Sequence, residues 1–253
     1  MRTLVAMGDS YSSGEANPPF DAGTNVKDGD QCHRSANAWP RLLATSDPTI
    51  ALEAHIACSG ATTKDVISKS FNTEPPQITQ LEALSQPPQL VTVTIGGNDL
   101  GFASVLSNCF EFNCVLDHRL TTARNYITKT LPGVLGKAYA AIRAAEPDAE
   151  VAVIGYPRLF PEKQSDTHNC GWLSRTERLK LNDLAGLVDS VIGTAAGKAG
   201  FKYVSTLNAF TGHEECTTHS WLYPIAKVPL PYDGHPLLAG QQALEAIVRK
   251  ALG

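Results

Sequence analysis

The sequence predicts a three-layer α/β/α fold around a central five-stranded parallel sheet. Five short apolar runs, rich in Val, Ile and Ala, are bounded by Gly, Pro or Asn in the manner of buried strands. Helical patterns lie between them, and strands that alternate with helices indicate a parallel sheet with helices on both faces. Right-handed crossovers then make a flavodoxin-like strand order the simplest topology.

The strands are expected at Thr3–Met7, Ile50–Ile56, Leu90–Ile95, Glu150–Gly155 and Phe201–Ser205. The clearest helix begins at Ser174, which forms a capping box with Glu177. Apolar residues then recur at spacings of three and four, which places them on one helix face. This helix is expected to end near Gly197 or Gly200.

A second helical pattern covers Leu120 to Ala145, but Pro132 must kink or split it because proline removes a helix hydrogen bond. A last helix is expected from about Leu237 to Ala251. The long loops are Ser10–Asn37, Gly96–Asp117 and Leu207–His235. Ligands bind at the carboxyl ends of parallel strands, so functional residues are expected in these loops.

Composition indicates a globular protein that forms a single domain over residues 1–253. Hydrophobic residues make up 43% of the chain and charged residues 18%, which a disordered chain would not show. The net charge is -4 and no Lys/Arg cluster exceeds two residues, which argues against a nucleic-acid partner. No apolar stretch approaches the roughly 20 residues of a membrane span, so stable membrane insertion is not expected. We expect a monomer, and an exported form would have lost its signal peptide.

The cysteines are even in number and lack the C-x-x-C spacing of a structural zinc site, so no metal is expected. They are Cys32, Cys58, Cys109, Cys114, Cys170 and Cys216. Of 15 possible pairings we expect the one that joins neighbours in chain order, because it closes three modest loops. The expected pairs are Cys32 with Cys58, Cys109 with Cys114, and Cys170 with Cys216. Disulfides persist in oxidising compartments and so favour an extracellular or periplasmic protein. The alternative is a set of unpaired, buried thiols in a cytosolic protein.

The first expected strand runs directly into Gly8-Asp9-Ser10, which places Ser10 in a tight turn at the carboxyl edge of the sheet. A serine hydroxyl is a poor nucleophile unless a neighbouring base takes its proton. The same residue types are also ordinary choices for a turn or a helix start. The turn therefore points to chemistry only if other groups join it.

Two further turns offer donors at the same edge. Asn98 follows the third strand in Gly96-Gly97-Asn98-Asp99, and Gly60 follows the second strand. The Asn98 amide and the Gly60 N–H are the kinds of donor that form an oxyanion hole, worth about 3 kcal/mol each in acyl transfer. A phosphate cradle would instead require a lysine or a G-x-x-x-x-G-K-[ST] motif, which the chain lacks.

A candidate base lies in the segment Tyr232-Asp233-Gly234-His235-Pro236, just before the last expected helix. A histidine is most often a surface or hydrogen-bonded residue. Of the seven histidines, only His235 combines a Gly-His-Pro turn with a position that could face Ser10.

These four elements, around Ser10, Gly60, Asn98 and His235, resemble the four blocks of the SGNH, or GDSL, hydrolase family. The resemblance extends over nearly the whole chain and is closer still to the secreted Streptomyces-type GDSL lipases. The similar segments are Asp9–Gly14, Cys32–Ser35, Ala57–Ala61, Thr94–Asp99 and Gly155–Arg158.

The resemblance implies that Ser10 is the nucleophile and His235 the general base and later acid. It implies an oxyanion hole formed by the N–H groups of Ser10 and Gly60 and the side chain of Asn98. It also implies secretion, three disulfides in sequential order, and an ester or lipid substrate, namely carboxylic esters of fatty acids. Acyl transfer of this kind requires no cofactor.

One position departs from the family pattern. Many members carry Asp three residues before the catalytic histidine, where this chain has Tyr232, and Asp233 stands one position later. Two interpretations stay open: the Tyr232 carbonyl accepts the Nδ1 proton of His235, or Asp233 orients the ring. Two other functions also stay open, a carbohydrate esterase that removes acetyl groups and a secreted binding module without turnover.

Overall fold

The computed structural model describes residues 1–111, 118–163, 171–225, 230 and 232–253. Its strands are β1 (Arg2–Gly8), β2 (Ile50–His55), β3 (Leu90–Thr94), β4 (Glu150–Ile154) and β5 (Lys202–Val204). They form one parallel sheet in the order β2-β1-β3-β4-β5. The predicted flavodoxin-like order is confirmed, and each strand end lies within one residue of its prediction.

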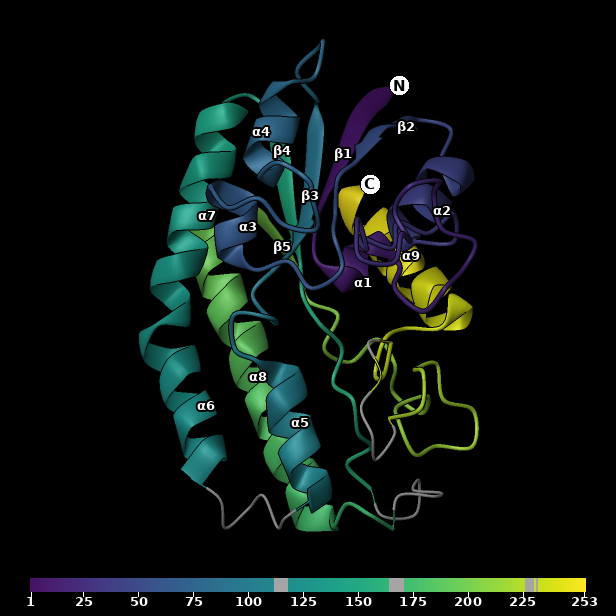
Figure 1. Cartoon of the computed structure of the whole chain (residues 1–253), viewed down its shortest axis with the longest axis vertical. Helices are drawn as coiled ribbons and strands as arrows, with labels where there is room; N and C mark the ends of the chain where they lie inside the picture. Colours follow the sequence, from purple (N-terminus) through teal and green to yellow (C-terminus); the bar gives the residue numbers. More distant parts are fainter. Residues whose placement is uncertain (112–117, 164–170, 226–229, 231) are drawn as a thin grey trace.

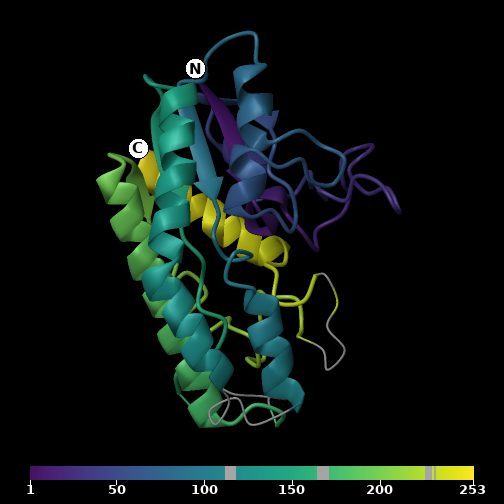
Figure 2. The same cartoon turned by 60° about the vertical axis from the view of Figure 1, so that its left-hand side comes forward.

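The helices of the described residues are α1 (Ser10–Ser13), α2 (Trp39–Ser46), α3 (Thr63–Ile67), α4 (Gln77–Glu82), α5 (Phe102–Glu111), α6 (His118–Lys129), α7 (Leu131–Ala145), α8 (Arg175–Lys198) and α9 (Leu238–Leu252). The α2 and α9 helices pack together on one face of the sheet, and α3, α4, α7 and α8 cover the other (Figure 1). Figure 2 shows α5, α6 and the first half of α8 extending past the carboxyl ends of the strands.

The middle of the sheet is buried because helices cover both of its faces, and strands in such a position are rich in apolar side chains. All five residues of β3 are buried. At its end β1 passes so close to β3 that a Cβ on Gly8 would lie 2.3 Å from the Thr94 carbonyl oxygen. Gly8 also has φ +121, which favours glycine, so this residue sets where the chain turns toward Ser10.

Two helix predictions are confirmed. The Ser174 hydroxyl accepts the Glu177 N–H at 3.3 Å, and the Glu177 carboxylate accepts the Ser174 N–H at 2.8 Å, which completes the capping box of α8. The long pattern around Pro132 is split into α6 and α7, with Pro132 in the first turn of α7, where a missing N–H costs nothing.

The predictions of loops over Ser10–Asn37 and Gly96–Asp117 are each wrong in part, because the single turn α1 occupies Ser10–Ser13 and α5 occupies Phe102–Glu111. The sequence of α5 contains Ser, Asn and Cys, which are weak helix formers. Val105 and Leu106 are each 8% exposed and pack into the core, so tertiary contacts stabilise this helix.

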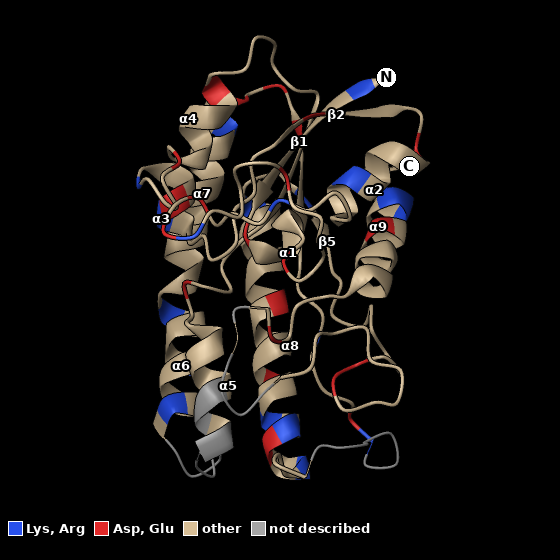
Figure 3. Cartoon of the chain, turned by 45° about the vertical axis from the view of Figure 1, so that its right-hand side comes forward, with Lys and Arg blue, Asp and Glu red and all other residues tan. Residues whose placement is uncertain are grey.

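Charges are distributed over several elements of the described chain. Figure 3 shows basic and acidic positions interspersed along α8 and α9. No described helix is both long enough and apolar enough to span a bilayer.

His55 at the end of β2 supports α1. Its Nδ1 accepts the Nε–H of Arg41 at 3.3 Å, so its Nε2 carries the proton and donates to the Ser12 carbonyl of α1 at 2.8 Å. Burial lowers the pKa of His55 to about 3. The imidazole is therefore neutral in the folded protein at any ordinary pH.

This neutral histidine predicts acid sensitivity. Between an unfolded pKa of about 6.5 and the folded value, only the unfolded chain binds the proton, so stability falls as the pH is lowered, by at most about 1.4 kcal/mol per pH unit. We expect the Tm of the wild type to fall more between pH 7.5 and pH 4.5 than the Tm of His55→Gln, which lacks this titration. Parallel Tm curves for the two proteins would contradict the assignment.

Candidate active site

Ser10 is the first residue of α1, a single helical turn that follows β1 directly. Asp9 caps this helix by accepting the Tyr11 N–H at 3.1 Å, and Gly14 ends it in the left-handed conformation with φ 88. The first N–H groups of a helix have no partner within it, so the Ser10 N–H is available to a ligand. Ser10 is 6% exposed and lines the main pocket.

Asn98 and Gly60 belong to two turns that are tied to each other. The Asn98 Nδ2 donates to the Ala61 carbonyl at 3.0 Å, and Asp99 accepts both the N–H and the hydroxyl of Thr63, at 2.9 and 2.6 Å. The Gly60 N–H forms no hydrogen bond among the described residues, although the N–H groups on either side of it are bonded. Asn98 lines the pocket and Gly60 is outside its lining.

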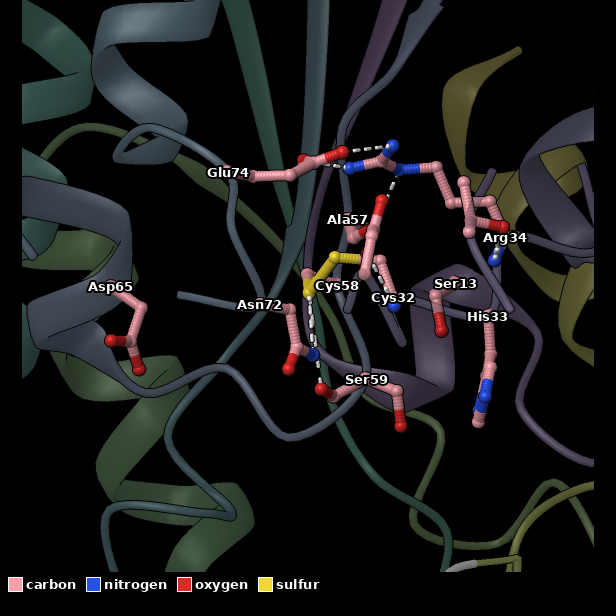
Figure 4. Close-up of a disulfide and its surroundings, with 12 residues drawn as sticks. Ser13, Cys32, His33, Arg34, Ala57, Cys58, Ser59, Asp65, Asn72 and Glu74 are labelled. Atoms are coloured by element: carbon pink, nitrogen blue, oxygen red, sulfur yellow. Dashed lines mark hydrogen bonds and ion pairs between the residues drawn. A yellow bond between two sulfur atoms is a disulfide. The ribbon is translucent and has the colours of Figure 1, made fainter. Parts of the chain in front are cut away.

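The disulfide between Cys32 and Cys58 braces the turn that carries Gly60 (Figure 4). Arg34 reaches across the disulfide, donates to the Ala57 carbonyl at 3.0 Å and forms a two-pronged ion pair with Glu74. The turn is thus fixed both by a covalent bond and by a half-buried ion pair.

The first predicted pairing, Cys32 with Cys58, is confirmed, and the alternative of unpaired thiols is wrong. Cys109 and Cys216 are each disulfide-bonded. Their predicted partners, Cys114 and Cys170, lie outside the described residues, so those two pairings stay predictions.

The loop that carries His235 is held against α1 and the segment after it by two hydrogen bonds. The Tyr11 hydroxyl donates to the Gly234 carbonyl at 2.8 Å, and its ring lies 5.5 Å from the imidazole, centre to centre. Asn17, four residues beyond α1, donates to the Pro236 carbonyl at 2.6 Å. The loop before α9 is therefore anchored to the segment that follows Ser10.

The Nδ1 atom of His235 is buried and makes no hydrogen bond with the described residues. The Tyr232 carbonyl accepts the His235 backbone N–H at 3.2 Å, and the Asp233 carboxylate accepts the Leu230 N–H at 3.1 Å. Burial lowers the pKa of His235, whereas buried Glu15 and the neighbouring Tyr232 and Asp233 act to raise it. The imidazole is therefore neutral, as a base must be, and the group that orients it stays a prediction.

A pocket brings the candidate residues together. It spans about 1080 Å³ of empty space, which includes its opening to solvent. Ser10, Asn98, Asp233 and His235 line it, whereas Tyr232 does not. Ser10 Oγ and His235 are not hydrogen-bonded to each other, which is common in enzymes without substrate. The other walls are mostly apolar: Leu100, Phe102, Ala103, Leu106, Pro157, Leu159, Ala185, Val188, Ile225 and Leu230.

Comparison with known proteins assigns nearly the whole chain to one family. The model of the GDSL-like Lipase/Acylhydrolase family matches residues 6–243. The chain belongs to this family.

Relatives of this GDSL hydrolase include Lipase 1 of Streptomyces coelicolor, 38% identical over 94% of this chain and 81% of the relative. Among solved structures, phospholipase A1 from Streptomyces albidoflavus aligns with a TM-score of 0.83 and 36% identity, covering 99% of both chains. The extracellular lipase of Streptomyces rimosus aligns with a TM-score of 0.85 and 33% identity, over 99% of this chain and 100% of that one. The protein is a carboxylic ester hydrolase.

Sequence reasoning missed several groups of this GDSL hydrolase site. Asp9 and Tyr156 line the pocket and are hydrogen-bonded to each other, and Tyr11 holds the histidine loop. Buried Glu15 pairs with His33 at 2.6 Å. The Asp9 and Tyr156 positions stand in two of the segments that carry the family resemblance, which is the signal that could have found them.

Proposed function

We propose that the protein is a secreted lipase or esterase that hydrolyses fatty acyl esters through an acyl-enzyme on Ser10. His235 takes the Ser10 proton as Ser10 Oγ bonds to the ester carbonyl carbon. The negative charge that forms on the carbonyl oxygen is held by the N–H groups of Ser10 and Gly60 and by the Asn98 amide. His235 then gives its proton to the leaving alkoxide as the ester bond breaks.

Water completes the cycle by the same steps in the second half. His235 takes a proton from water as the water oxygen bonds to the acyl carbon, and Ser10 leaves with the proton that His235 returns. No residue ends in a changed state, so the enzyme turns over without a cofactor.

The apolar pocket beside Ser10 is the main support for a fatty acyl substrate. Its walls come from α5 and α8 and from the loop before α9, and its described lining contains no lysine or arginine. An acetyl group would leave most of this apolar surface exposed to water. A longer alkyl chain would gain about 0.8 kcal/mol of binding free energy for each CH₂ that it buries. A fatty acyl chain is thus favoured over the acetyl group that a carbohydrate esterase removes.

The Cys32–Cys58 disulfide supports secretion, because disulfides persist in oxidising compartments. The Streptomyces rimosus relative is an extracellular lipase by its description.

A phosphonate probe combined with a chain-length series tests the proposal. We expect a serine-reactive alkyl phosphonate to label one site per chain, at Ser10, and kcat/KM for p-nitrophenyl esters to rise from acetyl to octanoyl. Inertness toward the phosphonate would instead favour a binding module, and a preference for acetyl would favour a carbohydrate esterase.

A substitution inside the pocket tests whether the pocket holds the acyl chain of the substrate. Ala185→Phe on α8 would fill part of the pocket. It should lower kcat/KM for the octanoyl ester about tenfold, while kcat/KM for the acetyl ester changes little. The matched control is Ala140→Phe on the exposed side of α7, outside the pocket. Equal losses of kcat/KM for both esters would argue against an acyl chain in this pocket.

A further inference from the structure

A chain of hydrogen bonds joins the nucleophile helix to the turn that carries Asn98. One oxygen of Asp9 accepts the Tyr11 N–H within α1 at 3.1 Å, and the other accepts the Tyr156 hydroxyl. The Tyr156 oxygen in turn accepts the Gly97 N–H at 3.1 Å. Tyr156 is thus the only side chain of the described residues that bridges Asp9 and Gly97.

The direction of each bond is fixed by chemistry. The Gly97 N–H can only donate, so the Tyr156 oxygen accepts there and its own proton is left for Asp9. Burial raises the pKa of Tyr156 well above its ordinary value, so the hydroxyl keeps this proton at working pH. Burial also raises the pKa of Asp9 to about 7, as expected of a carboxyl group shut away from water.

The bridge lies between rigid supports. Tyr156 follows β4 by two residues, and its ring packs edge-on against Tyr11 at 5.2 Å between centres. A Cβ on Gly97 would lie 3.3 Å from the Tyr156 hydroxyl and 3.2 Å from its ring. A side chain at this position would push the tyrosine away by a few tenths of an ångström, so glycine keeps the hydroxyl close to the main chain before Asn98.

We propose that Tyr156 is a positioning residue for the oxyanion hole, and that its hydroxyl fixes the place of Asn98 relative to Ser10. The proposal rests on the oxyanion role of Asn98 stated above. A donor contributes to catalysis only where it meets the oxygen of the transition state, and a misplacement of about 1 Å can cost 10²-fold in rate. Loss of the bridge should therefore affect turnover and leave substrate binding intact.

Tyr156 also lines the pocket, so a direct contact with the substrate is the competing explanation. A contact of that kind would change KM and would act independently of Asn98. A positioning role would be lost once the Asn98 amide is absent. A double-mutant cycle separates the two.

The experiment compares Tyr156→Phe, Asn98→Ala and the double variant by kcat and KM on p-nitrophenyl octanoate. We expect Tyr156→Phe to lower kcat about 10- to 100-fold with KM within about twofold. In the Asn98→Ala background the same change should lower kcat by less than about threefold. Unchanged kcat in Tyr156→Phe, a rise in KM alone, or equal effects in both backgrounds would each overturn the proposal.

Failure of the underlying mechanism has a separate signature. If Asn98→Ala itself leaves kcat unchanged, the oxyanion role of Asn98 is wrong and the positioning role falls with it. If Asn98→Ala lowers kcat but Tyr156→Phe does not, only the positioning role is wrong.

Two further variants protect the test against simple loss of stability. Gly97→Ala pushes on the bridge from the other side with Tyr156 intact, and it should reproduce the fall in kcat. Tyr203→Phe is the matched control, because it also removes a tyrosine hydroxyl that donates to a carboxylate, Asp189 at 2.6 Å, outside the pocket. Its kcat should stay within about twofold of the wild type, and a loss as large as that of Tyr156→Phe would count against a specific role.

Discussion

Replacing Ser10 with alanine is expected to lower kcat for p-nitrophenyl esters by about 10⁴-fold or more, because the variant has no atom that can form the acyl-enzyme. The change should cost little stability, since the first helical position tolerates alanine and no side-chain hydrogen bond of Ser10 is formed among the described residues. Steady-state rates, a thermal melt and loss of phosphonate labelling together measure the effect.

Ser12→Ala is the control for the Ser10 experiment. It removes another buried hydroxyl of α1, one that donates to Thr94 at 3.0 Å, and so tests whether disturbance of the helix alone stops the reaction. Ser12→Ala should keep activity within a few-fold of the wild type. Turnover that survives in Ser10→Ala would refute Ser10 as the nucleophile.

His235→Ala should lower kcat about 10³- to 10⁴-fold, because no other described side chain of the pocket is a neutral base placed to take the Ser10 proton. In the wild type only the neutral imidazole acts, so kcat/KM should fall on the acidic side. Burial lowers the pKa of His235, which places this acidic limb below the ordinary histidine value of about 6.5. A wild-type limb above that pH, or an active His235→Ala, would contradict the assignment.

Asp233→Asn extends this experiment to the two candidates for orienting the ring. The Asp233 charge raises the pKa of His235, so its removal should move the acidic limb to lower pH. If the Tyr232 carbonyl orients the ring, kcat should change by less than about tenfold. If Asp233 does so, kcat should fall about 10²-fold or more, as loss of an orienting carboxylate does in related catalytic groups.

Much of this architecture could be predicted from local pattern. The five strands are continuous apolar runs. The Ser174 capping box and Pro132 each mark a helix start through residues that are close together in the chain. The four sequence blocks that suggested chemistry could also be placed near one another, because parallel strands bring their carboxyl ends to one edge. For Ser10, Asn98 and His235 that placement is what the pocket shows.

The α5 helix and the tyrosine bridge could not be predicted in the same way. The sequence of α5 has weak helix propensity, and its helix depends on packing of Val105 and Leu106 against residues far along the chain. The bond between Asp9 and Tyr156 joins positions 147 residues apart, and no periodicity or spacing encodes such a pair.

The sequence by itself determined the five strands, the family resemblance and the candidate nucleophile, since each depends on short stretches of chain with their own physical preferences. The strand order followed from the general handedness of crossovers between parallel strands. Tertiary structure alone decided that α5 and α8 wall an apolar pocket and that Asp9 is buried. It also decided that Tyr156 joins Asp9, at the start of α1, to the turn of Asn98. Burial and hydrogen bonding between distant segments exist only once the chain has folded, and these interactions give the serine its surroundings.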